Sequence, residues 1–205
     1  MEFLTGVKEK ETIGIREILS GDYVGKTVKM NGAVHNIRDM GEFAFIILRK
    51  AEGLVQCVYE EGKTEFDLKD LKEESAVEVT GVIALEERAP QGFELRLTGI
   101  RVLSEPAETM PIAINKWKMN TSLETRLSLR PVSLRNVRER AKFKIQEGIV
   151  RGFREFLSSQ GFTEVHTPKI VSRGAEGGAN VFKLNYFNKK AELGQSPQFY
   201  KQMMV

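Results

Sequence analysis

The sequence predicts two modules of different fold class, a small β-barrel followed by an α+β module. From Lys26 to Leu103, short β-prone runs alternate with glycines and charged turns. From Leu134 onward, apolar residues recur every three to four positions, which is the period of a helix. Charge changes between the two parts, since residues 1–112 carry 14 basic and 21 acidic side chains and residues 113–154 carry 11 and 3. Such a change is typical of two modules.

The composition excludes several classes of protein. The chain has 205 residues, 41% hydrophobic and 29% charged, with a net charge of +3, which excludes disordered and fibrous proteins. No apolar run approaches the ~20 residues that span a bilayer, and the N-terminus is charged too early for a signal peptide. One cysteine, Cys57, excludes an internal disulfide, and only His35 and His166 could join it at a zinc ion. We therefore expect a reduced, cytoplasmic, metal-poor protein that does not bind a membrane.

Five segments of the first module have the pattern of β-strands. They are Lys26–Ile37, Glu42–Arg49, Leu54–Tyr59, Ala76–Ala84 and Phe93–Leu103. The pattern at residues 50–53 indicates a hairpin turn. One or two helical turns are expected around Phe66, Leu68 and Leu71. Five strands with a short helix between the third and fourth are the layout of an OB-fold barrel, although other small barrels and sandwiches fit the periodicity nearly as well.

Three side chains of the middle strands could form a binding face. Phe43 and Phe45 lie two residues apart, hence on one face of a strand, and Gln56 lies on the strand paired with it. An exposed Phe stacks on a nucleobase at roughly 1–3 kcal/mol, and a Gln amide can read a base edge. The alternative, that these phenylalanines fill the barrel core, is the commoner use of Phe in a barrel.

A connector and a long helix follow the barrel. Residues 106–130 contain two prolines and no regular period, so they read as a linker that ends at Pro131. Ser133 is the expected N-cap of an amphipathic helix of about 26 residues, and Gly161 is its expected left-handed C-cap. Gly148 and Gly152 inside this helix indicate close packing of another backbone.

The last part of the chain alternates short strands and loops. A β-prone run ends at Pro168, a glycine-rich segment at 172–180 contains Glu176, and residues 181–187 alternate like a strand. Ser196 and Pro197 are then expected at the N-cap and first position of a helix. That start places Gln198, Lys201 and Gln202 on one helix face. This face would suit a small anionic or amino-acid ligand, or be merely solvated.

These segments carry a family resemblance. GFTEVHTPKIV resembles motif 1 of the class II aminoacyl-tRNA synthetases, and AEGGANVFKLNYF followed by QSPQFYKQMM is similar to the archaeal and eukaryotic type of aspartyl-tRNA synthetase and its asparaginyl relatives. GAVHNIRDMGEFAFIILRKAEGLVQCVY resembles the anticodon-binding OB-fold of that subgroup. The resemblance implies an anticodon-binding domain at 1–105, a linker at 106–130, and the first part of an antiparallel-sheet catalytic domain at 131–205.

The resemblance also implies roles for residues of the barrel. Phe45 matches the aromatic that stacks on an anticodon base, and Gln56 matches the amide that reads the central base, a U in the anticodons of tRNA(Asp) and tRNA(Asn). Arg38 matches a basic residue that contacts the anticodon stem-loop.

In the second module, Gln198 and Lys201 match the pair that holds the substrate amino acid. Glu176 lies in the matching loop that closes over it, near its ammonium group. Lys201 is a point cation suited to a carboxylate, which favours aspartate over asparagine or lysine. Pro168 and the helix before it match the interface of a homodimer.

The resemblance further implies ATP and Mg²⁺ as cofactors of a full-length aspartate–tRNA ligase. Motifs 2 and 3, which hold ATP in class II enzymes, are not found in the 205 residues. We therefore expect no catalytic residue and no bound cofactor in this chain, which by itself should not adenylate an amino acid. Two alternatives remain open at this point: a stand-alone anticodon-binding module, and a fragment of an asparaginyl- or lysyl-tRNA synthetase.

Overall fold

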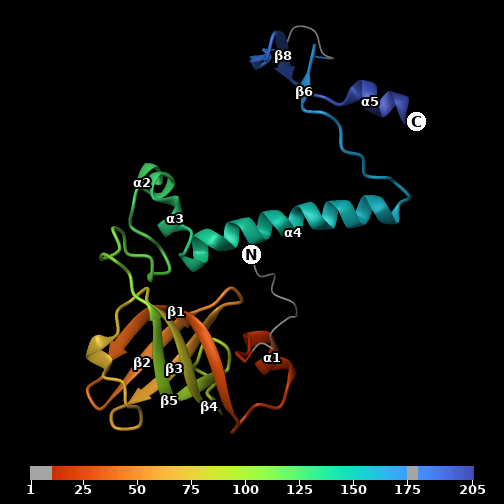
Figure 1. Ribbon diagram of the computed structural model, residues 1–205. Helices are drawn as coiled ribbons and strands as arrows, with labels where there is room; N and C mark the ends of the chain where they lie inside the picture. The colour runs from red at the N-terminus through yellow and green to blue at the C-terminus, as the bar shows by residue number, and fades with distance from the viewer. Residues whose placement is uncertain (1–10, 175–179) are drawn as a thin grey trace, which may run out of the picture. The chain divides into compact units, whose positions relative to one another are not determined.

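The computed structural model describes residues 11–174 and 180–205, and its first part is a closed five-stranded barrel (Figure 1). The strands are β1 (Thr27–Asp39), β2 (Phe43–Arg49), β3 (Leu54–Glu60), β4 (Ala76–Leu85) and β5 (Phe93–Ser104). Their order in the barrel is β1-β2-β3-β5-β4, and β4 closes the barrel by pairing with β1. Every pair is antiparallel except β3 with β5, which is parallel. The predicted β-barrel is confirmed, with each strand within two residues of its expected bounds.

Alternate side chains of each strand fill the barrel core. In β2, Ala44, Ile46 and Leu48 are almost completely buried, so Phe43 and Phe45 point to the outer surface. Fully buried side chains of the other strands complete the core: Met30, Val34, Val55, Cys57, Val77, Val79, Ile83 and Leu95. The prediction that the two phenylalanines share one face is therefore confirmed, and the alternative that they fill the core is wrong.

Short elements seal the barrel. The predicted turn is confirmed by the Lys50 amide, which donates to the Gly53 carbonyl over 2.8 Å. The expected helical turn is the 3₁₀ helix η1 (Leu68–Asp70), between β3 and β4. A helix that the sequence analysis did not predict, α1 (Ile15–Ser20), packs Ile15 and Ile18 into the core.

The linker forms a second, smaller core. Ile112, Ile114 and Met119 are buried there against Leu129 and Val132. Two short helices follow one another here, α2 (Leu123–Ser128) and α3 (Arg130–Ser133). The linker segment is therefore ordered by its own apolar contacts.

The predicted single helix from Ser133 is wrong, because the chain breaks into two helices at this point. Ser133 ends α3 and is buried, and its hydroxyl donates to the Arg126 carbonyl over 2.8 Å. Asn136 is the cap instead: its Oδ1 accepts from the amides of Arg138 and Glu139 at 3.0 and 3.1 Å. Helix α4 (Val137–Ser159) therefore begins three residues later than an N-cap at Ser133 requires.

Two glycines of α4 and the one after it test the other expectations for this helix. Gly161 has a φ of +83°, which confirms the left-handed C-cap. A Cβ added at Gly148 or Gly152 would meet no described atom within 4 Å. The expected close packing of another backbone against these glycines is therefore not seen among the described residues.

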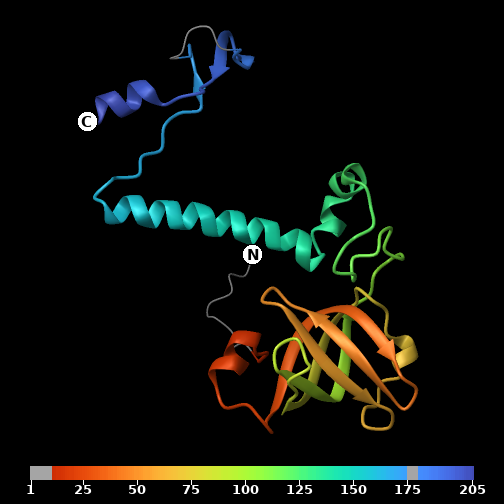
Figure 2. The same cartoon turned by 180° about the vertical axis from the view of Figure 1, so that it is seen from behind.

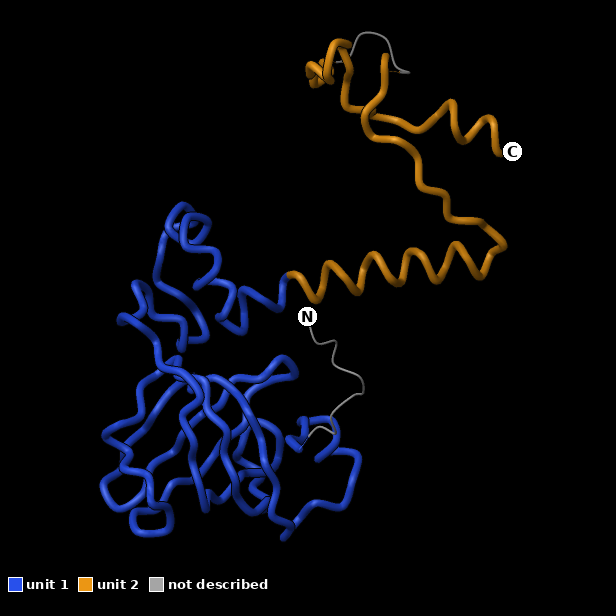
Figure 3. Tube along the Cα trace, in the orientation of Figure 1, with its two compact units in different colours: residues 1–142 blue, residues 143–205 orange. Residues whose placement is uncertain are grey.

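The chain divides into two compact units, residues 1–142 and 143–205 (Figure 3). The second unit contains a small antiparallel sheet of order β6-β8-β7, which Figure 2 shows from behind, followed by α5. Its elements are β6 (Ile170–Val171), β7 (Lys183–Tyr186), β8 (Lys189–Leu193) and α5 (Gln198–Met203). The expected strand before Pro168 is wrong, since residues 162–168 lie outside any strand. Pro197, not Ser196, is the N-cap of α5.

None of the described helices is both long enough and apolar enough to cross a lipid bilayer.

Candidate nucleic-acid interface

The outer face of β1 and β2 brings a cation and two aromatic rings together. Arg38 of β1 and Phe45 of β2 are directly paired in the antiparallel register, so their side chains emerge on the same side. The rings of Phe43 and Phe45 lie edge to face, with centroids 5.4 Å apart. Phe43 is 37% exposed and Arg38 is also exposed, so this face is open to a ligand.

Gln56 joins the same face from β3. It pairs with Ile47 while Phe45 pairs with Val58, so Gln56 and Phe45 are diagonal neighbours across the two strands. Diagonal neighbours lie about 7–8 Å apart, within reach of one nucleotide. The structure therefore brings together the three residues predicted for the barrel, Arg38, Phe45 and Gln56.

A carboxylate that the sequence pattern did not predict holds Gln56. Glu94 of β5 is paired with Gln56 in the parallel register, and Gln56 Nε2 donates to Glu94 Oε2 over 3.3 Å. Because a carboxylate only accepts hydrogen bonds, the amide nitrogen must face Glu94, which leaves Gln56 Oε1 and one N–H for a ligand. Arg96 Nε donates to the other oxygen of Glu94 over 3.4 Å. A glutamate within the apolar run FELRL was the sequence signal for this position.

This arrangement can bind an unstacked nucleobase. The exposed ring of Phe43 and the half-buried ring of Phe45 offer a stacking surface. The fixed amide offers one acceptor and one donor, and Arg38 and Arg96 offer cations for phosphates. Glu94 is 7% exposed, and the Arg96 guanidinium that donates to it offsets its negative charge toward an incoming phosphate.

A second polar cluster lies where the barrel meets the linker. Arg49 at the end of β2 donates two hydrogen bonds to Glu74, at 2.6 and 2.7 Å, and both side chains are buried. Arg135, from the segment between α3 and α4, donates to the same carboxylate over 3.0 Å. Glu74 has a φ of +68°, and its amide donates to the Val34 carbonyl. This ion-pair cluster fixes the linker to the barrel.

The cluster shifts the pKa of two of its members. Burial, and secondly the nearby Arg49, hold the pKa of His35 below its usual value, and Arg49 Nη1 lies 3.2 Å from His35 Nδ1. Burial would raise the pKa of Glu74, but the hydrogen bonds and charges of Arg49 and Arg135 outweigh it and lower that pKa. His35 is therefore neutral and Glu74 charged at neutral pH, which suits an ion-pair junction.

A hollow of about 610 Å³ beside this cluster is not the predicted site. It is lined by loop residues 72–74 and by the linker from Pro106 to Asn115, with His35 at its side. Neither Phe45 nor Gln56 lines it. Among the described residues, no group of three histidine, cysteine, aspartate or glutamate side chains could hold a metal ion.

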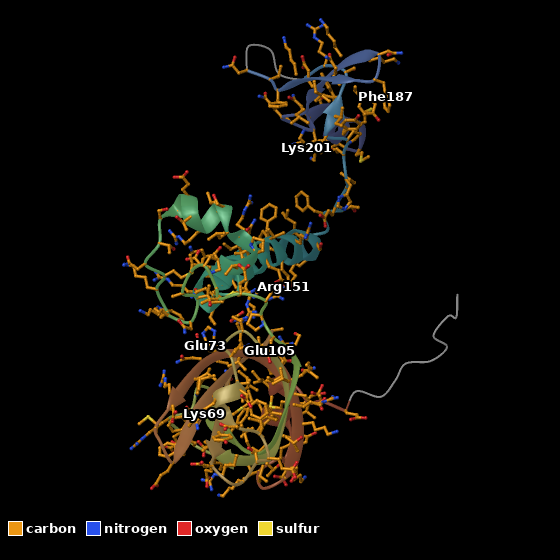
Figure 4. All side chains as sticks on the ribbon, turned by 60° about the vertical axis from the view of Figure 1, so that its left-hand side comes forward. Lys69, Glu73, Glu105, Arg151, Phe187 and Lys201 are labelled. Carbon is orange, nitrogen blue, oxygen red and sulfur yellow. The ribbon has the colours of Figure 1, made fainter. Side chains whose placement is uncertain are left out.

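The residues predicted for amino-acid binding are only partly placed. Gln198 and Lys201 lie one turn apart on α5, both exposed, and Figure 4 shows Lys201 in the second unit. Pro168 is also exposed, in the extended stretch before β6. Glu176 lies outside the described residues. Among the described residues, Gln198 and Lys201 share a face of α5, and the amino-acid site itself stays a prediction.

Two family models match the chain, one in each part. Residues 28–103 match the family described as "OB-fold nucleic acid binding domain", and residues 122–205 match "tRNA synthetases class II (D, K and N)". The first match covers the barrel with its outer face. The second covers α2 to α5, the segments that include Pro168, Gln198 and Lys201.

Proteins of known name are similar over most of the chain. An aspartate–tRNA(Asp/Asn) ligase of Deinococcus radiodurans is 46% identical over 181 residues, which are 88% of this chain and 40% of that protein. A ligase of the same name from Archaeoglobus fulgidus is 43% identical over 185 residues, covering 88% of this chain and 43% of that protein. The chain thus spans about two fifths of the length of these relatives.

Solved structures show the same architecture. The asparaginyl-tRNA synthetase of Pyrococcus horikoshii, complexed with asparaginyl-adenylate, superposes with a TM-score of 0.78 at 32% identity, covering 90% of this chain and 43% of that one. A putative aspartyl-tRNA synthetase of Leishmania major gives a TM-score of 0.75 at 30% identity, covering 100% of this chain and 42% of that one.

Proposed function

The chain belongs to the class II aminoacyl-tRNA synthetases of the aspartate, lysine and asparagine group, and from this premise we propose that it is part of an aspartate–tRNA ligase. In this proposal, the barrel binds the anticodons of tRNA(Asp) and tRNA(Asn), and the second unit is the first part of the catalytic domain. The names of the relatives from Deinococcus and Archaeoglobus support the aspartate assignment and the two tRNAs. The observation that carries the proposal is the shared outer face of Arg38, Phe45 and Gln56.

Anticodon reading follows from the chemistry of that face. The ring of Phe45 stacks on the central base, and Phe43 supports the ring from its edge. Gln56, held by Glu94, presents Oε1 and one N–H to the base. Uracil offers an N3–H donor beside a carbonyl acceptor, which matches this pair. Arg38, across from Phe45, then contacts the phosphate backbone.

In the proposed enzyme, residues of the second unit bind the substrate amino acid. Gln198 and Lys201 would hold aspartate, with the Lys201 ammonium paired with the side-chain carboxylate, and Glu176 would approach the substrate ammonium. Pro168 would lie in a homodimer interface. The full-length enzyme, a cytoplasmic ligase, would use ATP and Mg²⁺ to activate aspartate. The described residues include no cluster of carboxylates fit to hold Mg²⁺, so we assign none of them to that ion.

Binding of anticodon stem-loops tests the proposal. We expect stem-loops of about 17 nucleotides with Asp and Asn anticodons to bind more tightly than the same loops with the central U replaced by C, because Phe45 and Gln56 face that base. Fluorescence anisotropy at two salt concentrations measures the difference. Phe45→Ala should weaken binding of the Asp and Asn loops about tenfold through lost stacking. Gln56→Ala should chiefly reduce the preference over a loop whose central U is replaced by C, because it removes the base-edge contact.

Leu103→Ala is the matched control, because Leu103 is an exposed apolar residue near the end of β5, nine positions along that strand from Glu94. It should leave all affinities unchanged. Equal affinity for every loop, falling in parallel with added salt and indifferent to Phe45→Ala, would contradict the proposal. The barrel would then bind only the RNA backbone.

A further inference from the structure

An exposed tryptophan in the linker has no role in the anticodon face. Trp117 is the one tryptophan of the chain, and 71% of its surface is exposed. Lys116 and Lys118 on either side of it are exposed as well. We call residues 115–118 the Trp117 segment. An exposed indole between two exposed cations is a surface on which a nucleobase can stack, so this segment is a candidate for binding.

The backbone of the Trp117 segment is fixed from two sides. Asn136 Nδ2 donates to the carbonyls of Ile114 and Lys116, at 2.8 and 2.7 Å. Asn115 Nδ2 lies 3.1 Å from both carboxylate oxygens of Glu73, in the loop before β4. Figure 4 shows Glu73 at the end of the barrel from which the linker leaves.

The residues beside the segment are buried while its indole is not. Ile114 and Met119 lie in the second core with Leu129 and Val132. The chain thus turns Ile114 and Met119 inward and holds Trp117 outward on a bend whose carbonyls are bound. Because this backbone is already held by hydrogen bonds, the segment loses less conformational entropy when its aromatic ring meets a ligand, which favours a stacking platform.

The charges around the ring indicate the chemistry of the ligand. Among the described residues, neither Lys116 nor Lys118 forms an ion pair. Arg138 is exposed in the first turn of α4, where its amide binds the same Asn136 that holds the segment. An aromatic face between free cations matches a nucleobase between phosphates. It fits a protein partner less well, since interface cores are depleted in lysine.

The segment also lies away from the anticodon face. It is bound to Glu73, the neighbour of Glu74, and Glu74 pairs with Arg49 at the last position of β2. Phe45 lies four residues earlier on that strand, a separation of about 13 Å at ~3.3 Å per residue. A ligand on the Trp117 segment is therefore a different part of the RNA from the base stacked on Phe45.

We propose that the Trp117 segment is a second RNA-binding site, at which Trp117 stacks on a nucleotide of the tRNA outside the anticodon stem-loop and Lys116 and Lys118 contact its phosphates. This inference rests on the proposed function, because it takes tRNA as the ligand. It adds a contact by which the enzyme would read or hold the body of the tRNA in addition to its anticodon.

Intrinsic fluorescence of the 205-residue chain tests this site directly, because Trp117 is the sole tryptophan. A full-length tRNA(Asp) transcript should quench the emission when the indole stacks on a base. The Asp anticodon stem-loop, bound to saturation as shown by anisotropy of a labelled RNA, should leave the emission unchanged.

Substitutions give the second measurement. Trp117→Ala should weaken binding of the full transcript about tenfold and leave stem-loop affinity unchanged. The double variant Lys116→Glu and Lys118→Glu should reduce the dependence of log K on log salt by about two for the transcript alone. Lys69→Glu, a charge reversal at an exposed lysine of η1, is the matched control. Trp117→Phe keeps an aromatic ring and should retain most of the affinity. If it does, the weaker binding of Trp117→Ala is due to lost stacking and not to a folding defect.

Two results would overturn the inference: a bound transcript that does not quench Trp117, or equal quenching by transcript and stem-loop. Failure of the proposed function looks different, since the stem-loop itself would then bind without dependence on Phe45. Unchanged transcript affinity in Trp117→Ala, with Phe45-dependent stem-loop binding intact, would remove the second site and leave the anticodon site standing.

Discussion

The two units of the chain use their apolar side chains in opposite ways. In the barrel, the inward residues of all five strands are buried, and each strand is paired on both sides. Among the described residues of 143–205, Ala191 alone is buried, and α4 has no buried residue. Its large apolar side chains are exposed: Phe143, Ile145, Ile149, Val150, Phe153 and Phe156.

The difference separates a self-sufficient domain from an incomplete surface. The barrel closes its hydrogen bonds and its core with its own residues, which leaves the outer face of β1, β2, β3 and β5 free for a ligand. The apolar side chains of α4 would need a covering surface that the described residues do not supply. Stability should therefore depend on residues of the barrel far more than on those of the second unit.

The largest expected contrast is between Leu48→Ala and Phe153→Ala. Leu48 is completely buried, so its truncation should lower the free energy of unfolding by about 2–5 kcal/mol. Phe153 is exposed, and its truncation should change that free energy by less than about 0.5 kcal/mol. The measurement is guanidinium unfolding followed by labelling of Cys57, whose pKa is raised by burial and which is the only thiol, so that it reacts when the barrel opens. Equal losses in the two variants would mean that both units share one cooperative core.

Two glycine substitutions sharpen the same contrast at a smaller scale. A Cβ at Gly81 would lie 2.4 Å from the Arg96 carbonyl oxygen, so Gly81→Ala should destabilise the barrel by about 1–3 kcal/mol. A Cβ at Gly152 would meet nothing, so Gly152→Ala should favour the helix by up to about 1 kcal/mol. Thermal unfolding by circular dichroism at 222 nm measures both. A loss of helicity in Gly152→Ala would show that another backbone does approach this helix.

The smallest expected effect is a loss of barrel stability as the pH falls. Because the pKa of His35 is lowered on folding, the unfolded chain binds a proton that the folded barrel does not. Stability is then fully present above about pH 6.5, the usual value, and falls as the pH drops toward the lowered pKa. Glu74, whose pKa is also lowered, adds a second loss below about pH 4.5. Burial is the largest cause of the lowered pKa of His35. Arg49 and Arg140 lower it further because they repel the imidazolium, whereas Glu74 attracts the imidazolium and so raises the pKa.

His35→Asn keeps an acceptor near the position of Nδ1 and cannot titrate. Unfolding free energies at pH 7.5 and 5.5 should therefore differ in the parent chain and agree in this variant. An equal decline in both would assign the acid sensitivity to other groups.

The strands of the barrel could be predicted because their inward positions alternate strictly, as in AVEVTGVIA, which became β4. The register of the strands could not be predicted. The pairing of β1 with β2 shifts by one residue between Val34 and Asn36, and this irregularity places Arg38 opposite Phe45. The helix break was missed because Ser133 is a good N-cap by type, whereas the choice of Asn136 depends on tertiary contacts with the linker.

The candidate site was predictable to the same extent. Phe45 and Gln56 follow from strand alternation and family resemblance, but their shared face required the β2–β3 pairing. Glu94 was missed because β3 and β5 pair in parallel, with β4 between them in the sequence, and such distant pairing leaves no local pattern. Gln198 and Lys201 share a helix face, as expected, and their roles stay predictions.

The barrel has a consequence for the order in which the chain acquires structure during synthesis. All its strands are complete at Ser104, and none of its strand pairs requires a later residue. At about 5–20 residues per second, the ribosome takes roughly 3–11 s to make the 55 residues from Ser104 to the end of α4 at Ser159, while small β-barrels fold in milliseconds to seconds. The nascent chain would therefore display the finished outer face of β1, β2 and β3 before the exposed apolar side of α4 is fully synthesised.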